Sequence, residues 1–597
     1  MGATAMTPVD HVKLGTVATD SKPRPDPTVG DDEMPEVAAQ RTDVHSPEEL
    51  ASAATQAARA TSWSSGIARH SSVMALGSLV SRVTGFARTA ILGAVLGAFA
   101  VGDSYQVANT LPNMVYELLI GGVLASVVVP LLVGARRDAD GGEAYIQRLL
   151  TLAVLLLAAA TIIAVLAAPL ITSLVATKTE DRHLVTLLAY LLIPELFFYG
   201  IAALFGAVLN TRGHFAAPTW APILNNLSII VTAGIFVALP GPALPTPSTI
   251  TTDQLLVLGL GTTFGVALQA AALWPALRRV GFRWRWRFDF GNSSFTEAGR
   301  LAGWMLCYVG VSQVSVFVVM ALAYRAGQAG GPGPAVYEAA SLMFMMAHGI
   351  IAVSIITALL PRMSAAAAEN KTKDVAHQLS FGIRLSSVIL MPATAAYMAL
   401  GVPLAIAAFQ WGNFSSDRAQ STGLAIVAVA LGLVPFAVSQ LQTFAFYAMR
   451  DTKTPALINI PVVVIRLFVD IVLFLSLPAH YVVIGLMIGN AVSYAVAAAL
   501  LTLAMRRRLG SLHFGRIFQT LARLLLASVI AGLIGWGLAF SCTELLGGGK
   551  LGGVMALGIG GSALVISFVA ASVFLRVQEV SQFVQTVTRK FALRRGL

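Results

Sequence analysis

Long apolar segments recur along most of this 597-residue chain, each followed by a short polar stretch. Most reach the roughly 20 residues that an α-helix needs to cross the hydrocarbon core of a bilayer. Hydrophobic residues make up 56% of the chain and charged residues only 12%, which excludes an ordinary soluble protein. We expect an all-α polytopic membrane protein with about fourteen spans, near 69–97, 105–133, 147–176, 184–210, 216–239, 254–277, 298–325, 335–360, 377–408, 421–449, 455–478, 481–505, 518–540 and 551–576.

Lys and Arg are concentrated in alternate loops between these segments. The loops around 278–287, 371–373 and 506–508 are basic and fall on one side of the predicted bundle, whereas the opposite loops hold few basic residues. Basic loops stay on the cytoplasmic side of a membrane. The net charge of +11 is therefore a topology signal, and we expect no nucleic-acid partner. With an even number of spans, the pattern predicts that both termini are cytoplasmic.

The two ends of the chain differ from its middle. Residues 1–65 are polar and lack apolar periodicity, so they cannot bury enough surface to offset the entropy of ordering, and we expect a disordered cytoplasmic tail. Residues 577–597 form a basic cytoplasmic tail. Two cysteines are too few for a disulfide framework or a metal cluster, and no nucleotide or zinc motif is present. We expect no cofactor and no metal.

A weak internal repeat divides the spans into two sets. Pro130 and Pro361 end corresponding spans, Pro218 and Pro455 begin corresponding spans, and the two pairs have nearly the same separation in the sequence. Transporters built from such repeats bind substrate between the two halves at mid-depth. The predicted organisation is an N-lobe of six spans at 66–280, a basic linker at 281–296, a C-lobe of six spans at 297–507, and two extra C-terminal helices at 508–576.

The first apolar segment carries two arginines, Arg82 and Arg88. Six residues correspond to about 9 Å along a helix axis. An arginine at the centre of a bilayer costs at least ~2.5 kcal/mol unless it faces water or a partner. Two of them in one span indicate a water-filled cationic cavity that receives an anion. The alternative is that both extend to one interface or pair with carboxylates elsewhere.

The same residues carry a family resemblance. The run from Ser81 to Arg88 (SRVTGFAR) and the downstream Leu111-Pro112-Asn113 resemble the MurJ (MviN) lipid II flippases, which belong to the multidrug/oligosaccharidyl-lipid/polysaccharide exporter superfamily. The resemblance extends over about residues 68–505. It implies a transporter, not an enzyme, in the bacterial cytoplasmic membrane.

The resemblance also implies a substrate and partners. The substrate is lipid II, the disaccharide-pentapeptide linked to undecaprenyl pyrophosphate, and Arg82 and Arg88 would hold its diphosphate. Arginine suits this role because its planar guanidinium makes two parallel hydrogen bonds to phosphate. The extra C-terminal helix pair forms a groove for the lipid tail in this family. Membrane lipids are further implied partners, and contact with proteins of cell-wall synthesis is left open.

Further site positions follow from the resemblance. Asp103 matches an acidic position at the outer mouth of the second span. Asn109 and Asn113 either bind sugars or satisfy the helix kink at the intervening proline. This chain departs from the family at Tyr116, where many members have an arginine, and at Ser341, which with its neighbour Ala340 replaces an Asp-Arg pair. Half of the family's arginine cluster is therefore missing.

Intramembrane carboxylates raise functional hypotheses of their own. Glu195 either pairs with Arg82 or Arg88, which we favour, or carries a proton. Arg466 and Asp470 are four residues apart and share a helix face. Some members of the resembled family bind sodium at these two positions and a third, which is Val319 here. We interpret Arg466 and Asp470 as an ion pair that replaces the metal; the alternative is a purely structural contact between spans 11 and 12.

Two other functions remain open on the sequence. One is export of another polyprenyl-linked glycan or of a drug cation, although a cationic drug would be repelled by Arg82 and Arg88. The other is a membrane-embedded glycosyltransferase. That enzyme would need an acidic catalytic residue on a sizeable outer loop, and the predicted outer loops are short.

Overall fold

The computed structural model describes residues 73–74, 76–117, 143–288, 296–510, 514–577 and 579–580. The chain divides into two units, Met1–Gly66 and Ile67–Leu597, and every described residue belongs to the second. The predicted tail at 1–65, most of the basic C-terminal tail and the second half of the predicted second span lie outside the described residues. Within the described ranges every regular element is helical, which confirms the predicted all-α class.

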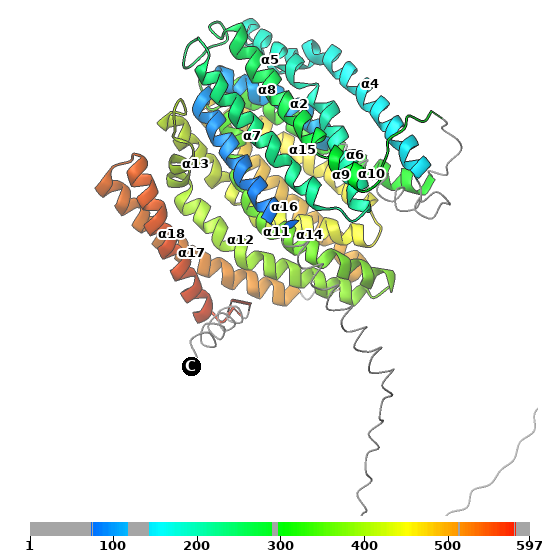
Figure 1. Ribbon diagram of the computed structural model, residues 1–597. Helices are drawn as coiled ribbons and strands as arrows, with labels where there is room; N and C mark the ends of the chain where they lie inside the picture. The colour runs from blue at the N-terminus through cyan, green and yellow to red at the C-terminus, as the bar shows by residue number, and fades with distance from the viewer. Residues whose placement is uncertain are drawn as a thin grey trace, which may run out of the picture. The chain divides into compact units, whose positions relative to one another are not determined.

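The predicted N-lobe begins with helix 76–96, which runs from Leu76 to Leu96. Most later helices begin a few residues before the predicted span and end a few after it, since helices extend beyond the hydrocarbon core. The helices of this lobe are α2 (Ala100–Glu117), α4 (Glu143–Val175), α5 (Thr179–Leu192), α6 (Glu195–Thr211), α7 (Ala216–Ala238), α8 (Thr252–Ala271) and the short α9 (Trp274–Arg279) (Figure 1).

The remaining helices belong to the predicted C-lobe and to the two extra C-terminal helices. They are α10 (Thr296–Gln328), α11 (Pro334–Ala368), α12 (Thr372–Phe409), α13 (Ser416–Ala430), α14 (Leu433–Ala448), α15 (Lys453–Ser476), the one-turn 3₁₀ helix η2 (Ala479–Tyr481), α16 (Val482–Leu509), α17 (Phe514–Leu546) and α18 (Lys550–Phe574).

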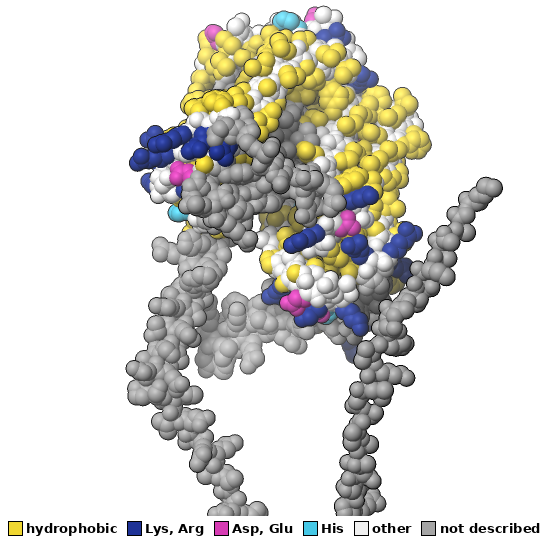
Figure 2. Space-filling model, turned by 90° about the vertical axis from the view of Figure 1, so that its right-hand side faces the viewer, with side chains coloured by type: hydrophobic (Ala, Val, Ile, Leu, Met, Phe, Trp, Pro, Cys, Tyr) yellow, Lys and Arg dark blue, Asp and Glu magenta, His cyan; other side chains and the backbone are white. Residues whose placement is uncertain are grey.

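Twelve helices of the described residues are long and apolar enough to cross a membrane, or thirteen when the bent pair α13 and α14 counts as one span. The one predicted span missing from this count is the second, at 105–133. Its first part is α2, and the rest lies outside the described residues. Many large apolar side chains lie on the surface. Leu166, Leu475 and Phe574, for example, are 76%, 76% and 85% exposed. Figure 2 shows a broad hydrophobic surface with Lys and Arg side chains gathered largely at its lower margin. Such a surface is stable only in lipid.

Two of the predicted spans are broken at equivalent places. The span predicted at 184–210 consists of α5 and α6, which meet at Ile193, and the span at 421–449 consists of α13 and α14, which meet at Leu431. The second pair is bent by 49°. The separation of Ile193 from Leu431 in the sequence nearly equals that of Pro218 from Pro455, the repeated prolines. The shared break supports the predicted two-lobe repeat.

The described part of the basic linker lies along α4. The side-chain amide of Gln147 donates to the carbonyl of Arg283 at 2.7 Å, and Arg287 Nε donates to Gln147 Oε1 at 3.0 Å. The backbone N–H of Arg287 also donates to the hydroxyl of Thr151 at 3.2 Å. These contacts fix 281–288 at the basic end of the predicted N-lobe; residues 289–295 lie outside the described ranges.

The two helices outside the repeat, α17 and α18, pack on each other and against α12. Figure 1 shows them on the side of the bundle away from α4. Small residues allow their close approach: a Cβ added at Gly535 of α17 would lie 3.0 Å from the carbonyl oxygen of Gly560 in α18. The pair is therefore a firmly attached part of the helical unit.

Candidate functional site

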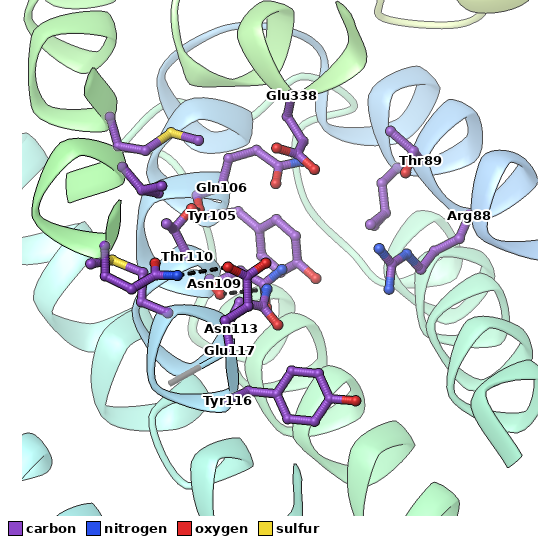
Figure 3. Close-up of a pocket in the computed structure, with 15 residues that line it drawn as sticks. Arg88, Thr89, Tyr105, Gln106, Asn109, Thr110, Asn113, Tyr116, Glu117 and Glu338 are labelled. Carbon is purple, nitrogen blue, oxygen red and sulfur yellow. Dashed lines mark hydrogen bonds between the residues drawn. The ribbon is translucent and has the colours of Figure 1, made fainter. Parts of the chain in front are cut away.

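A polar cavity of about 310 Å³ lies between helix 76–96, α2, α10 and α11. It is placed between the two predicted lobes, because the first two helices belong to one and the last two to the other. Figure 3 shows its labelled side chains converging from these walls. The lining residues are Arg88, Thr89, Leu92, Tyr105, Gln106, Asn109, Thr110, Asn113, Met114, Tyr116, Glu117, Gln313, Val316, Met320 and Glu338.

Arg88 supplies the cationic side of the pocket. Its side chain extends from helix 76–96 toward the opposite wall formed by α2 (Figure 3). It makes no ion pair with a described residue, and its buried Nε has no hydrogen-bond partner among them. The planar guanidinium has the donor geometry that phosphate oxygens match.

The opposite wall follows one face of α2. Asn109 and Asn113 are one turn apart, and Asn113 Nδ2 donates to the carbonyl of Asn109 at 2.9 Å. Pro112 frees the carbonyl of Ala108, not that of Asn109, so this bond does not decide between the kink role and the sugar-binding role of Asn113, which also lines the pocket. Asn109 also lines the pocket, and its side-chain amide is not bonded to a described residue.

Two carboxylates also face this cavity. Glu117 ends the described part of α2, and its Oε2 accepts a hydrogen bond of 2.6 Å from Gln313 Nε2 of α10. Glu338 lines the pocket from the first turns of α11. The described lining therefore combines one guanidinium with two carboxylates, amides and hydroxyls, a formal charge of −1, so only the Arg88 side attracts an anionic group, whereas the polar wall suits hydrogen-bonding groups.

Arg82 does not line the pocket and packs instead against α11. A Cβ added at Gly349 would lie 2.2 Å from Arg82 Nη1, so the missing side chain at Gly349 makes the space for the guanidinium. The neighbouring His348 is buried, and its ring packs at a tilt against Phe436 with 4.3 Å between ring centroids. The structure thus separates the two arginines that the sequence places in one cavity.

Glu195 follows the break between α5 and α6 and is completely buried. The expected ion pair with Arg82 or Arg88 is not formed in this structure, because the carboxylate turns toward α8. The hydroxyl of Thr263 lies 3.4 Å from Glu195 Oε1 and 2.6 Å from the carbonyl of Leu191, and Oε2 has no hydrogen-bond partner among the described residues. Glu195 does not line the pocket.

Asp103 lies in a second cavity, of about 500 Å³, together with Arg418. Its Oδ1 accepts a 2.9 Å hydrogen bond from the backbone N–H of Ala335, in the first turn of α11. A Cβ at Gly333, which precedes that turn, would lie 2.1 Å from Oδ2. A carboxylate at a helix N-terminus satisfies free N–H groups and complements the helix dipole. Asp103 thereby joins α2 to α11.

Arg466 and Asp470 are in contact on α15, as predicted. Arg466 Nε lies 3.6 Å from Asp470 Oδ2, and the Asp470 side chain is fully buried. Arg466 Nη2 also donates to the hydroxyl of Tyr337 in α11 at 3.2 Å. A Cβ at Gly489 of α16 would lie 1.9 Å from Asp470 Oδ1, so this glycine admits the carboxylate. The pair lies between three helices of the predicted C-lobe.

Residues 92–549, well over half of the chain, match the family model for the lipid II flippase MurJ. The chain belongs to the MurJ lipid II flippase family. This family transports and is not an enzyme family, which confirms the predicted family and class. The fold, the many apolar helices and the family together make the protein a multi-pass protein of the bacterial inner membrane.

Curated MurJ relatives match at low identity over most of their length. The chain is 26% identical over 482 residues to a probable lipid II flippase MurJ of Haemophilus influenzae, which covers 77% of this chain and 90% of that protein. It is 26% identical over 476 residues to a lipid II flippase MurJ of Burkholderia cenocepacia, which covers 77% and 87%.

Solved structures support the fold. A lipid II flippase MurJ in an inward closed conformation aligns with a TM-score of 0.67 at 18% identity and covers 84% of this chain and 98% of that one. An inward-facing multidrug resistance transporter of the MATE family aligns with a TM-score of 0.59 at 17% identity, covering 74% and 99%. The chain therefore shares the fold of these two transporters.

In this MurJ-family chain, the structure brings Arg88, Asn109 and Asn113 into one pocket and leaves Arg82, Asp103, Glu195 and Ser341 outside its lining. Ser341 lies one turn after Glu338 on α11. The sequence analysis did not assign Gln106, Glu117 and Gln313 to the site. Polar residues at 106, 109, 110, 113 and 117 recur at helical spacing in an apolar span, and this pattern was the available signal.

Proposed function

We propose that this protein moves lipid II across the bacterial cytoplasmic membrane by alternating access and breaks no covalent bond. The observation that carries the proposal is the pocket in which Arg88 faces amide, hydroxyl and carboxylate groups between the two predicted lobes of a MurJ-family chain. Arg88 binds the diphosphate, and Asn109 hydrogen-bonds the adjoining sugar. Its curated relatives carry the name lipid II flippase, which agrees with this assignment.

The size of the cavity sets a condition on the mechanism. About 310 Å³ is at the lower limit for ligand pockets, which hold roughly 300–1,000 Å³. A diphosphate and part of one sugar fit into such a volume, whereas a complete disaccharide-pentapeptide does not. The rest of the substrate therefore lies outside the pocket that the described residues line.

The predicted outer end of the bundle is held closed by contacts between the lobes. The side-chain amide of Asn413 donates to the carbonyls of Val95 and Ala243, both at 2.7 Å, and its backbone N–H donates to Ala94 at 2.7 Å. The Asp103 bond to Ala335 adds a further link near this end. With both termini cytoplasmic, as the basic loops predict, substrate enters this conformation from the cytoplasmic side.

Depletion of the protein in its own host tests the proposal. We expect lipid II to remain inaccessible to a cleaving enzyme or binding antibiotic added outside the cells, and wild-type protein but not the Arg88→Ala variant to restore access. If lipid II stays accessible while another polyprenyl-linked glycan disappears from the surface, the transported substrate is that glycan and the proposal is wrong.

A further inference from the structure

A cationic cavity, far in sequence from the Arg88 pocket, lies where α12, α17 and the end of α18 meet. Its volume is about 400 Å³. Each element contributes one arginine: Arg384 from α12, Arg523 from α17 and Arg576 from the turn after α18. Glu579 is the one carboxylate among the lining residues, so three guanidiniums and one carboxylate leave a formal charge of +2. The transport cycle proposed above does not use these residues.

Arg576 has a backbone conformation that residues other than glycine rarely adopt. Arg576 has a φ of 55°, in the left-handed region where glycine is the usual residue. Its N–H bonds to Val573 at 3.0 Å, and the N–H of Val577 bonds to Ser572 at 3.0 Å, which is the Schellman arrangement that ends a helix. Arg523 Nη1 donates to the carbonyl of Arg576 at 3.2 Å. An arginine therefore occupies a glycine position beside a second arginine.

The arginines have unused donors. Arg384 is held by an ion pair with Glu579, and its buried Nε has no hydrogen-bond partner among the described residues. Arg523 and Arg576 are both exposed, and Arg523 uses one of its donors on a carbonyl. A guanidinium carries five N–H donors in a fixed plane that matches phosphate oxygens. The cavity thus presents a surplus of charged donors to an anion.

A separate apolar cavity of about 250 Å³ lies farther along α12 and α17. Met391 and Met398 line it from α12, and Leu525, Leu533 and Trp536 line it from α17. The stretch from Arg523 to Trp536 spans about 20 Å along the axis of α17. A phosphate group beside an extended apolar groove corresponds to the shape and polarity of one phospholipid molecule.

We propose that this region is a binding site for an anionic phospholipid of the membrane. Arg523 and Arg576 bind the headgroup phosphate, Arg384 adds a third positive charge, and an acyl chain lies in the groove between α12 and α17. All three arginines lie at the end of the helices where basic loops predict the cytoplasmic leaflet, and anionic lipids bind in basic pockets between helices there. The proposal thus places a structural lipid on α17, one of the two helices where the family resemblance implies the tail of the transported substrate.

The test measures binding of lipid to the full-length protein purified in a neutral detergent. Thermal unfolding is followed as phosphatidylglycerol, phosphatidylcholine with the same acyl chains, or glycerol phosphate is added. We expect stabilisation by phosphatidylglycerol alone. The double variant R523Q/R576G should need about tenfold more phosphatidylglycerol for the same shift in Tm, as expected for the loss of one or two charge-assisted bonds.

Two features keep the result interpretable. Arg576→Gly removes the guanidinium at a position where glycine relieves the backbone, so the lipid-free variant should unfold at the same temperature or higher. Arg285→Gln removes an exposed arginine of the basic linker and should leave the response unchanged. Equal responses to both lipids, an unchanged response in R523Q/R576G, or an equal loss in Arg285→Gln would each overturn the proposal. Stabilisation by glycerol phosphate equal to that by phosphatidylglycerol would show a phosphate site without a lipid chain and would also overturn it.

Discussion

Arg466 and Asp470 stand one turn apart on α15 with 3.6 Å between Nε and Oδ2, and the carboxylate is fully buried. Breaking such a buried pair by removing one partner costs about 3–5 kcal/mol, because the remaining charge is left without compensation. Gly489 of α16 approaches the same carboxylate, which makes the pair a contact between helices as well as a charge pair. Both the metal-replacement and the structural interpretation therefore predict a cost, and sodium distinguishes them.

Arg466→Asn should lower transport and allow partial recovery as sodium is raised. Asparagine removes the cation from Asp470 and adds an amide oxygen, which together offer sodium ligands of the kind that hard cations prefer. The measurement is lipid II translocation in cells or vesicles with choline replacing sodium at constant ionic strength. Arg466→Asn/Asp470→Asn should lose the recovery. A sodium requirement in the unmodified protein that Asp470→Asn abolishes would contradict the interpretation.

Arg88→Ala should reduce transport by at least about tenfold, since a charge-assisted hydrogen bond contributes roughly 1.5–3 kcal/mol. Arg88→Lys should retain part of the activity, because it keeps the charge and loses the paired hydrogen bonds. Complementation of a depleted strain at matched membrane expression measures both. Arg285→Ala, which removes an exposed arginine of the linker, is the matched control and should complement fully. Normal growth with Arg88→Ala would show that the pocket does not hold the diphosphate.

Gly349→Ala should reproduce much of the effect of Arg82→Ala while leaving the arginine in the chain. The added methyl would lie 2.2 Å from Arg82 Nη1, so the guanidinium must leave its place against α11. The displaced atoms form the flexible end of a long side chain, so we expect a shift in Tm of only a few degrees. Transport and thermal unfolding of the purified variant are compared. Full transport in both variants would show that Arg82 has no transport role at this position.

Asn413→Ala should weaken closure at the predicted outer end, because it removes side-chain hydrogen bonds to Val95 and Ala243. A cysteine at Thr89, which lines the central pocket, reports this opening in a background with Cys307 and Cys542 replaced by alanine. A membrane-impermeant thiol reagent added outside should label Thr89→Cys faster when Asn413→Ala is present.

The control for this experiment is Ser248→Ala, a change in the same predicted outer region that removes an exposed hydroxyl. It should leave the labelling rate of Thr89→Cys unchanged. An identical rate in Asn413→Ala and the parent would mean that this asparagine does not hold the lobes together.

The orientation of the chain is tested with two exposed positions in the same cysteine-free background. Ser248→Cys lies in the loop 240–253 and should react with the impermeant reagent in intact cells. Arg285→Cys lies in the basic linker and should react only after the membrane is opened. The reverse pattern would place both termini outside and would invert the direction of entry proposed here.

Much of this molecule was predictable because a bilayer constrains a chain segment by segment. Helix 76–96 and the helices from α4 to α18 follow from local apolar length, since every backbone polar group in lipid must be satisfied within its own helix. The contact of Arg466 with Asp470 was predictable for the same reason: residues four apart on one helix are neighbours whatever the rest of the fold does.

The sequence does not indicate a side-chain contact that depends on the partner helix. Arg82 and Arg88 share one helix, yet Arg82 lies against Gly349 of α11 and Arg88 enters the pocket. Glu195 turns toward Thr263 and forms no ion pair with either arginine.

The sequence alone determined that the chain crosses a membrane many times, that its family is MurJ, and which residues are charged within the spans. Only the tertiary structure decided which of those charges meet. Helical periodicity determines the face of its helix on which a side chain lies. The packing of helices that are distant in sequence determines what that face contacts. For this reason Arg384, Arg523 and Arg576, which belong to three segments far apart in the chain, form one cavity that no local pattern indicates.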